Sequence, residues 1–590
     1  MKLIFKHLKK HIGKMALLVA FMIAGIKLQL MNAGYIADVV NIVMQSSSGL
    51  ILQSEADAQL VSVFIRMILI VLGILVTAVV VGRISARIAS VVSCDIRQEL
   101  YDRIMDFSMQ EIESLSIPSV ITRTTTETVQ IKDFLYMMLS TAIQAPFFII
   151  GGLISVVKCQ AQMAWTVGLV AGIMIISFVI VCIFSLPIMK VTFKQEDDMN
   201  RVAREALSGV QVIRALNRSD WSDKRLSDAS SGLKVTSKKY FNIILAYMPM
   251  MYLIIALANV LILWIGAERV DAGYMTVGVV TAYMEYSYMV GMGVILAINI
   301  CLALPGRIIS MNRLKEILDL PITVSEPDEP INVDSNDVEF QNVSFKYKED
   351  GKYVIRDISF RAKQGQTTAI IGNTGCGKST IVNLIPRLYE AAEGRVLIGG
   401  VDVKNQDICS LRAKIGFVPQ KVFLFSGTVN SNIAYGGVEV SKDAVTQASQ
   451  ISQSEEFILS HEEKYDYKIA RGGMNLSGGQ RQRMAIARAI ARHPKIYVFD
   501  DSFSALDYKT DKIVRNELSK ITKDSTVIIV SQRISTIQNA DQIVVMHDGE
   551  IVGIGTHGEL LKNCEMYNEI LKSQVSKEEY ERQKNVYQVV

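Results

Sequence analysis

Long apolar runs separated by polar stretches dominate the first half of this chain, and a shorter, strand-like pattern follows in the second half. Each apolar run is long enough to cross the ~30 Å hydrocarbon core of a bilayer as a helix. The six runs lie near residues 15–42, 60–82, 134–157, 164–187, 241–266 and 274–303. One such run could be a buried core helix, but six in succession predict an all-α, six-helix transmembrane domain at residues 15–320.

Lys and Arg are distributed unevenly between the runs, and this predicts the orientation. Residues 45–59 contain neither, and residues 158–163 contain only Lys158, whereas residues 83–133 and 188–240 are rich in both. By the positive-inside rule, both termini and both long loops lie in the cytoplasm. The pattern is that of a multi-pass protein of the cytoplasmic membrane.

The first fourteen residues, MKLIFKHLKKHIGK, are basic and precede the first apolar run. A secretory signal peptide has a similar beginning. The apolar stretch here is longer than a signal peptide needs, and no A-x-A-like cleavage site follows it. Residues 1–14 are therefore predicted to form a basic amphipathic elbow helix on the membrane surface.

The two long loops predict helical extensions of the spans. Each has about fifty residues, with apolar positions at helical spacing and few helix breakers. At 1.5 Å per residue, an arm of ~25 residues reaches about 37 Å beyond the membrane. Such long cytoplasmic helical extensions could contact a cytosolic domain.

The pattern changes after residue 320. Residues 321–335 contain prolines and several acids and predict a linker. From residue 336 to 575, short β-branched runs alternate with glycine turns and helices, which is typical of an α/β domain, and residues 576–590 form a C-terminal tail. The net charge of +4 among 590 residues is too small to indicate a nucleic-acid partner. The seven cysteines show no metal-ligand spacing and are interpreted as free thiols.

Two short motifs carry the chemistry of the second domain. Residues 372–380 read GNTGCGKST and fit the phosphate-binding P-loop, in which backbone N–H groups surround phosphate oxygens and a Ser hydroxyl faces Mg²⁺. The second motif, at residues 476–480, reads LSGGQ. The candidate phosphate-binding residues of the first motif are Gly372, Asn373, Thr374, Gly375, Cys376, Gly377, Lys378, Ser379 and Thr380; the resemblance described next adds Leu476, Ser477, Gly478, Gly479 and Gln480 as residues that contact a partner's ATP.

The LSGGQ segment resembles the signature of ATP-binding cassette (ABC) ATPases, and the whole chain resembles an ABC exporter half-transporter of the multidrug-resistance-like type IV fold. The resemblance implies ATP and Mg²⁺ as cofactors and a P-loop ABC ATPase domain after the membrane domain. It also implies that Tyr347 stacks on adenine, that Gln420 senses the γ-phosphate and the metal, and that the signature contacts the partner chain's ATP. Ser379, Gln420 and Asp500 are the implied Mg²⁺ residues, and Gly472 and Gly473 precede the signature as expected. The implied catalytic positions are Asp501, Gln532 and Asp507, the last of which ends the loop SALD. Residues 108–116 and 207–218 resemble the coupling helices of these exporters.

Two positions depart from the family pattern. The residue after Asp500 is normally Glu, which activates the attacking water, and here it is Asp501. The position that normally holds His is Gln532. Asp is one methylene shorter than Glu, and an error of ~1 Å can cost about 100-fold in rate. Gln cannot carry a positive charge. Both departures fall on one site and predict that it binds ATP but hydrolyses it poorly, so a second half-transporter with an intact site is the expected partner.

The sequence indicates the cargo less specifically than it indicates the ATP-binding site. Lys27 and Glu285 lie at membrane depth and are candidate substrate-cavity residues, while Arg66 is close enough to the membrane surface to reach it. The sixth run carries Met284, Met289 and Met292, which suit either packing or loose binding of apolar compounds. The expected function is ATP-driven export of amphipathic or hydrophobic drugs, lipids or peptides by a heterodimer surrounded by membrane lipids. A homodimeric multidrug or lipid exporter, an importer on an exporter-like scaffold and an ATP-gated regulator or channel remain alternatives.

Overall fold

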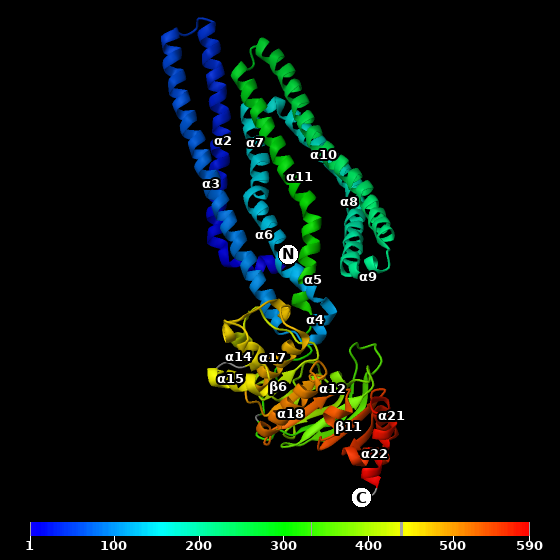
Figure 1. Ribbon diagram of the computed structural model, residues 1–590. Coiled ribbons are helices and arrows are strands. Elements are labelled where there is room, and N and C mark those ends of the chain that lie inside the picture. The colour runs from blue at the N-terminus through cyan, green and yellow to red at the C-terminus, as the bar shows by residue number, and fades with distance from the viewer. Residues whose placement is uncertain (1, 332, 437–439, 589–590) are drawn as a thin grey trace. The chain divides into compact units, whose positions relative to one another are not determined.

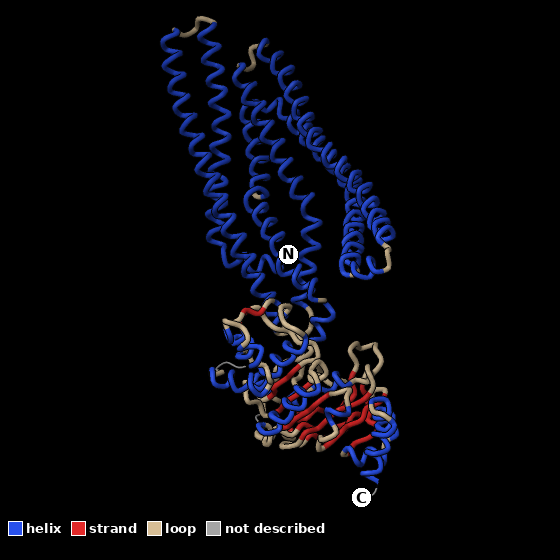
Figure 2. Tube along the Cα trace, in the orientation of Figure 1, coloured by secondary structure: helices blue, strands red, loops and turns tan. Residues whose placement is uncertain are grey.

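The computed structural model describes residues 2–331, 333–436 and 440–588, and the chain divides into two compact units. The helical unit comprises Met1–Met105 and Pro118–Asp319. The sheet unit comprises Asp106–Ile117 and Leu320–Val590. Figure 2 shows the strands confined to the sheet unit.

The helical unit is built from long helices and short connecting turns (Figure 1). The long helices are α2 (Ile12–Ser47), α3 (Gln53–Met105), α7 (Gln144–Gln160), α8 (Ala164–Ser208), α10 (Ser219–Asp271) and α11 (Val277–Asp319). The short ones are α1 (Lys2–Leu8), η1 (Lys9–His11), α5 (Ile117–Thr122), η2 (Arg123–Glu127), α6 (Thr128–Met137), η3 (Met138–Ala142), η4 (Ala161–Met163) and α9 (Val210–Ala215). Of these, η2 and η3 are π-helical turns.

Six helical stretches in the described part of the chain are long and apolar enough to cross a membrane, as the apolar runs predict. They are Ile4–Ser47, Gln53–Met105, Ile117–Cys159, Ala161–Ser208, Ser219–Asp271 and Val277–Asp319. Between 17% and 39% of each most apolar window is buried inside the unit. Much of the apolar surface of these helices therefore faces outward, as expected for helices in lipid.

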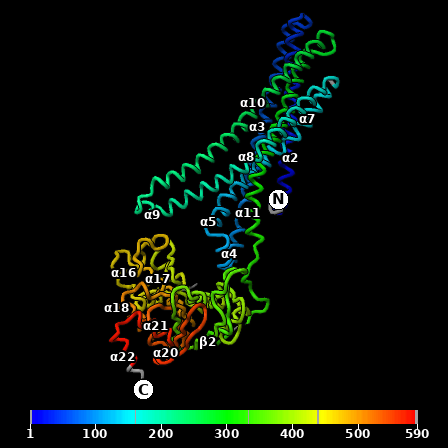
Figure 3. Tube along the Cα trace, turned by 90° about the vertical axis from the view of Figure 1, so that its right-hand side faces the viewer, coloured from blue at the N-terminus to red at the C-terminus, as the bar shows by residue number. Residues whose placement is uncertain are grey.

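The long helices pack in pairs. Helix α2 packs on α3, α7 on α11, and α8 on α10. Figures 1 and 3 both show α8 and α10 running side by side, away from α2 and α3, to a tip formed by α9. Helices α3, α8 and α10 continue well past their apolar runs, which confirms the predicted helical extensions.

The sheet unit contains twelve described strands. They are β1 (Val338–Phe345), β2 (Ile355–Ala362), β3 (Thr367–Gly372), β4 (Glu393–Ile398), β5 (Val401–Asp402), β6 (Ile415–Val418), β7 (Gly427–Thr428), β8 (Lys468–Ile469), β9 (Ile496–Asp500), β10 (Thr526–Val530), β11 (Gln542–His547) and β12 (Glu550–Gly555). Their sheets have the orders β2-β1-β4-β5, β12-β11-β3-β10-β9-β6 and β7-β8.

Helices and turns connect these strands. They are α4 (Met109–Leu115), α12 (Lys378–Leu384), η5 (Val403–Asn405), α13 (Ile408–Ala413), α14 (Val429–Ala434), α15 (Lys442–Ile451), α16 (Glu455–Leu459), η6 (Lys464–Asp466), η7 (Arg471–Gly473), α17 (Gly478–Ile490), α18 (Tyr508–Ile521), α19 (Ile534–Ile537), α20 (His557–Asn563), α21 (Glu565–Gln574) and α22 (Lys577–Gln588). The alternation of strands and helices confirms the predicted α/β domain.

The six-stranded sheet is parallel except for its edge strand β12, and both of its faces are covered. Successive side chains of a strand point to opposite faces. Ile371 and Phe499 accordingly belong to one buried cluster, while their neighbours Ile370 and Val498 belong to another. Two hydrophobic cores therefore hold the central strands rigidly, and their carboxyl ends lie at one edge of the sheet.

Helix α4 lies in the sheet unit although its sequence comes from the first long loop. Ser108 caps its N-terminus in a capping box with Glu111. Glu111 also accepts hydrogen bonds from the backbone N–H of Thr323 at 3.2 Å and from its hydroxyl at 2.7 Å. Burial alone would raise the pKa of Glu111, but the hydrogen bonds from Ser108 and Thr323 lower it below its ordinary value. The carboxylate thus joins α4 to the segment that leads into the first strand.

Candidate functional site

Three parallel strands end at the same edge of the sheet and bring the main candidate residues together. In the β9–β10 pairing Asp500 lies opposite Val530, and in the β10–β3 pairing Val530 lies opposite Ile370. Strand β3 ends at Gly372, the first residue of the P-loop, and Gln532 follows the end of β10. Side chains far apart in the sequence therefore meet at the carboxyl ends of β3, β9 and β10.

The loop between β3 and α12 has the backbone of a phosphate cradle. Gly375 and Gly377 have φ values of 87° and 96°, a left-handed conformation that favours glycine. A Cβ added at Gly377 would collide with Ile355. Lys378 begins α12, is 7% exposed, and donates to the carbonyl oxygens of Gly372 at 2.9 Å and Asn373 at 2.7 Å. The ammonium group is thus already placed beside the loop whose backbone would hold phosphates.

The residues expected to hold Mg²⁺ include a contacting pair. The Ser379 hydroxyl donates to Oδ1 of Asp500 at 3.0 Å. Asp500 is 4% exposed, and burial raises its pKa, an effect that the charge of Asp501 increases and that Ser379 and Lys378 oppose. A hydroxyl and a buried carboxylate at this spacing are oxygen ligands of the kind that Mg²⁺ prefers, so the donor set fits the ion.

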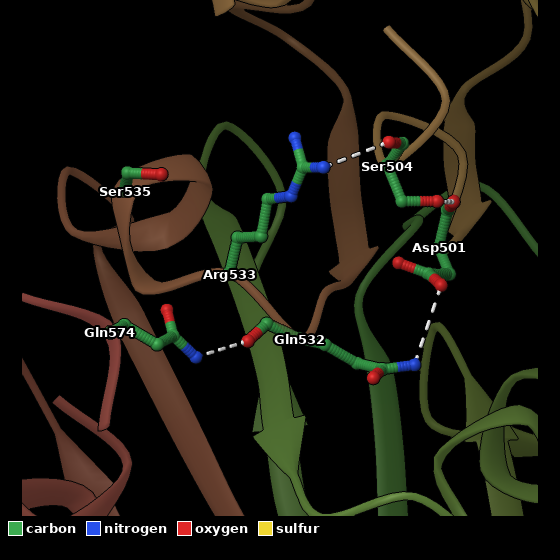
Figure 4. A pocket seen from close by; sticks show the side chains of 6 residues that line it. All are labelled: Asp501, Ser504, Gln532, Arg533, Ser535 and Gln574. Atoms are coloured by element: carbon green, nitrogen blue, oxygen red, sulfur yellow. Dashed lines mark hydrogen bonds between the residues drawn. The ribbon is translucent and has the colours of Figure 1, made fainter.

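Asp501 follows in a left-handed conformation, with φ of 47°. Its Oδ2 lies 3.4 Å from Nε2 of Gln420 and 3.5 Å from Nε2 of Gln532. Burial raises the pKa of this carboxyl, while Gln420 and Lys378 lower it in part. The two unusual residues, Asp501 and Gln532, therefore contact each other directly, as Figure 4 shows.

Two neighbouring cavities surround this pair. One, of about 180 Å³, brings together Thr374, Lys378, Ser379, Gln420, Asp500, Asp501 and Gln532 with other residues of the P-loop. The second, of about 560 Å³, is lined by Asp501, Ser504, Gln532, Arg533, Ser535 and Gln574 (Figure 4). Asp501 and Gln532 thus line both cavities.

Gln574 is a site residue that no sequence motif indicates. It comes from the end of α21, and its Nε2 donates to the carbonyl oxygen of Gln532 at 2.6 Å. Its Oε1 accepts from the backbone N–H of Ile534 at 2.9 Å. One amide therefore holds both sides of the segment that carries Gln532. The position is 42 residues from Gln532, so no local signal reveals it.

Tyr347 lies close to the P-loop helix. Its hydroxyl is 3.0 Å from that of Thr380, and its ring meets the ring of Tyr389 edge-on at 5.4 Å between centroids. The Tyr389 hydroxyl in turn donates to Oε1 of Glu113 on α4 at 2.8 Å. The backbone N–H of Met109 also approaches the carbonyl oxygen of Leu388 at 3.4 Å.

The LSGGQ segment and Asp507 are separate from these cavities. Ser477 caps α17 in a capping box with Gln480, and Leu476 is buried. Asp507 caps α18 by accepting from the backbone N–H of Thr510 at 3.0 Å, and this bond lowers its pKa. Ser477, Gly478 and Asp507 are exposed. These residues are accessible to another molecule and do not line either cavity.

Comparison with known proteins identifies the family. The model of the ABC transporter transmembrane region matches residues 15–294, and that of the ABC transporter matches residues 355–504. An uncharacterised ABC transporter ATP-binding protein of Mycobacterium tuberculosis is 36% identical over 486 residues, which cover 81% of this chain and 83% of that protein. The chain belongs to the ABC transporter family. Its sheet unit carries the ATP-hydrolysing domain of that family, for which ATP is the nucleotide.

Two further relatives of this ABC transporter have more specific names. A Bacillus subtilis ATP-binding/permease protein, whose name proposes multidrug export, is 31% identical over 502 residues, covering 82% of this chain and 84% of that protein. The ATP-dependent lipid A-core flippase of Chromohalobacter salexigens is 35% identical over 365 residues, covering 62% and 63% of the two chains.

A solved structure shares the fold of this ABC transporter. The structure of a bacterial Atm1-family ABC exporter with ATP bound superimposes with a TM-score of 0.82. It covers 97% of this chain and 99% of that one at 23% identity. The match confirms the predicted exporter architecture of six membrane-length helices followed by an ATPase domain.

The candidate cargo residues of the transporter lie in its helical unit and do not pair with each other. Lys27 on α2 and Arg66 on α3 are exposed, and Glu285 on α11 is half-buried. No salt bridge within the described ranges includes Lys27 or Glu285, so their cavity role stays a prediction. Met289 is buried, and Met284 and Met292 pack against the cores of the unit. The three methionines therefore serve packing here.

Proposed function

We propose that this chain is the degenerate-site half of a heterodimeric ABC exporter that moves amphipathic or hydrophobic compounds across the cytoplasmic membrane. In this proposal, residues 15–320 form the transmembrane domain and residues 336–575 the nucleotide-binding domain, with the ATPase and both termini in the cytoplasm. The observation that carries it is the pairing of Asp501 with Gln532 at the hydrolytic side of the ATP pocket.

The contacts of Asp501 support slow hydrolysis. A general base must reach a water in line with the γ-phosphate, and its carboxylate must accept the water's proton. Here the shorter Asp side chain has its Oδ2 near two amide groups, those of Gln420 and Gln532. An amide can donate a hydrogen bond but cannot supply the positive charge of a protonated His. The Asp501 carboxylate also lies ~1 Å further from the water than a Glu carboxylate would, which costs about 100-fold in rate. The site would therefore hold ATP through many cycles of its partner.

Exposed surfaces on both units support the need for a second subunit. Leu207, Val212 and Leu216, in and beside α9, are between 61% and 76% exposed. In the sheet unit, Phe423, Phe425 and Tyr435 form an exposed aromatic cluster beside Arg488. Large apolar side chains on surfaces outside the membrane are usually covered in the working assembly. The exposed Ser477 and Asp507 suit a second nucleotide held by that partner.

The names of the relatives support the cargo class. Multidrug export and lipid A-core transfer both concern molecules with apolar bodies and polar heads. The apolar outer surface of the helical unit suits a cargo that enters the transporter from the bilayer or from the bilayer surface. We therefore assign amphipathic drugs, lipids or hydrophobic peptides as the cargo.

The test compares binding and hydrolysis in the same purified chain. In lipid nanodiscs, the lone chain should bind a fluorescent ATP analogue in the micromolar range but turn over ATP very slowly. The double variant Asp501→Glu with Gln532→His should raise ATP turnover by about 100-fold, the factor expected from restored reach. Lys378→Ala in the same background is the matched control and should abolish that gain.

Rapid, vanadate-sensitive hydrolysis by the unmodified lone chain would contradict the proposal and favour a homodimeric exporter. A genuine partner, supplied from a second half-transporter with Glu and His at these positions, should restore turnover without any change to this chain. Disulfide trapping between Ser477→Cys in this chain and a cysteine introduced into the partner's P-loop should then occur only in the mixed dimer.

A further inference from the structure

A cavity of about 500 Å³ with both charged and apolar walls lies within the helical unit, far in sequence from the ATP-binding motifs. Its walls come from α5, η2, α6, α8, α10 and α11, all within residues 122–313. We call it the Glu127 cavity, after the most buried acidic residue in its wall. Its volume is within the usual range for a small-molecule site, roughly 300–1,000 Å³.

Glu127 is a buried carboxylate with an unused oxygen. The residue is 4% exposed, and its Oε1 accepts from Nη1 of Arg313 at 3.1 Å. Its Oε2 is buried and has no hydrogen-bond partner in the described part of the chain. A buried, unsatisfied carboxylate oxygen costs free energy unless a ligand completes it. Glu127 also ends the π-helical turn η2, a distortion that often occurs at functional sites.

Two further acidic residues line the cavity from α8. Glu196 and Asp197 both line it and are exposed, and no salt bridge among the described residues includes either of them. Across the cavity, Arg307 donates to Oε1 of Gln130 at 2.9 Å, and Arg313 is already paired with Glu127. Three carboxylates therefore face two guanidinium groups, and the excess charge is negative. This balance favours a cationic ligand.

The rest of the wall is apolar and aromatic. Phe193 and Met189 of α8 line the cavity together with Tyr240 of α10, whose hydroxyl lies 3.7 Å from the Met189 sulfur. Aromatic faces attract organic cations, and Met side chains adapt to varied apolar shapes. A charged head would lie among the carboxylates, and an apolar body would lie against this wall.

We infer that the Glu127 cavity binds amphipathic organic cations, with Glu127, Glu196 and Asp197 receiving the positive group. This inference names the cargo class of the exporter and rests on the proposed function for its place in transport. An anionic ligand would bind to Arg307. The three carboxylates in the same wall oppose such a ligand.

Binding can be measured without ATP. The full chain in phosphatidylcholine nanodiscs is titrated with ethidium, an aromatic cation, and separately with anilinonaphthalene sulfonate, an aromatic anion. The double variant Glu196→Gln with Asp197→Asn removes two exposed charges that form no salt bridge with any described residue, so the fold should be unaffected. We expect ethidium binding to weaken about tenfold, and sulfonate binding to stay equal or improve. Asp228→Asn, an exposed carboxylate on α10 outside the cavity, is the matched control and should change neither.

Two variants at the buried pair have opposite expected signs. Glu127→Gln should weaken ethidium binding, because the cation loses its buried acceptor. Arg313→Gln should strengthen it, because Glu127 loses the cation that competes for it. A purely structural role for the pair would weaken binding in both variants and would overturn the inference.

The outcomes also separate the site from the proposed function. Ethidium binding that depends on the carboxylates, without any ATP-driven ethidium transport by the assembled transporter, supports the site and contradicts export. ATP-driven ethidium transport with binding unchanged in all acidic variants supports export and overturns the site. Stronger binding of the sulfonate, lost in Arg307→Gln, also overturns it in favour of an anion site.

Discussion

The two sides of the ATP pocket differ in how closely they follow the chemistry that the family requires. On the phosphate side, Lys378, Ser379 and Asp500 are the expected residue types in contact with the expected groups. On the water side, Asp501 and Gln532 stand where the resemblance to the family predicts a Glu and a His. Holding a nucleotide and cleaving it therefore depend on different side chains, and one capacity can be lost while the other stays.

The altered side is as well ordered as the intact one. The backbone N–H of Asp501 donates to the carbonyl oxygen of Val530 at 3.0 Å, and the Ser504 hydroxyl donates to the carbonyl oxygen of Asp501 at 2.9 Å. Arg533 donates to the carbonyl oxygen of Ser504 at 3.1 Å. The low hydrolysis that we propose therefore follows from the functional groups present and not from a disrupted backbone.

The largest expected effect is on the phosphate side. Lys378→Ala should weaken ATP binding by at least about 100-fold, because a buried charge that faces the phosphates is lost. Titration with a fluorescent ATP analogue measures it, and Lys512→Ala, an exposed lysine on α18, should bind normally. Unchanged affinity in Lys378→Ala would show that the phosphate side does not hold the nucleotide as described.

The next test compares the effects of the two adjacent aspartates on ATP affinity and turnover. Asp500→Asn should remove most of the increase in ATP affinity that Mg²⁺ provides, about tenfold or more, because a metal-facing carboxylate becomes a neutral amide. Asp501→Asn should change affinity and the residual turnover of the lone chain by less than about threefold. Nucleotide titrations with and without Mg²⁺ measure both. A large loss of turnover in Asp501→Asn would instead show that this carboxylate is a working base.

A smaller effect is expected from Gln574, which positions the segment that carries Gln532. In the Asp501→Glu, Gln532→His background, Gln574→Ala should lower ATP turnover about fivefold, the cost of roughly one hydrogen bond. Nucleotide affinity should stay the same. Gln574→Glu keeps the acceptor for Ile534 but loses the donor to Gln532. Its ATP turnover should therefore lie between that of the background variant and that of Gln574→Ala. Ser573→Ala on the same helix is the control, and an equal loss there would mean that α21 is merely destabilised.

The smallest expected effect concerns the attachment of α4. Tyr389→Phe removes the hydrogen bond to Glu113, worth about 1 kcal/mol, and should speed amide hydrogen exchange across residues 109–115 about fivefold. Tyr353→Phe is the matched control, since that hydroxyl binds the exposed Glu393. Equal exchange in the two variants would mean that Tyr389 does not hold the helix.

Local patterns predict much of this molecule. The six membrane-length helices follow from long apolar runs, and the extensions of α3, α8 and α10 follow from helical spacing without breakers. Lys378, Ser379 and Asp500 could be placed at one sheet edge because a P-loop follows one parallel strand and an acidic residue ends another. The contact between Asp501 and Gln532 was within reach of the same reasoning.

Contacts between distant segments are what the sequence does not reveal. Gln574 reaches Gln532 across 42 residues, and Tyr389 reaches Glu113 across 276. Neither polar residue differs in type from many exposed ones, so only the fold distinguishes them. The Glu127 cavity is similar, because its carboxylates lie on helices whose separation no periodicity predicts. Lys27 and Glu285, chosen for their depth alone, are a weaker indication of a site than these buried contacts.

The aromatic contact beside the P-loop gives the sheet unit a short mechanical link. Adenine stacked on Tyr347 would rest against a ring that touches Tyr389, whose hydroxyl holds Glu113 on α4. Only two side chains would then separate the base from a helix that leads back to the membrane spans. A nucleotide retained for many turnovers would keep these contacts formed. The slow pocket would then stay closed while the opposite pocket opens and closes.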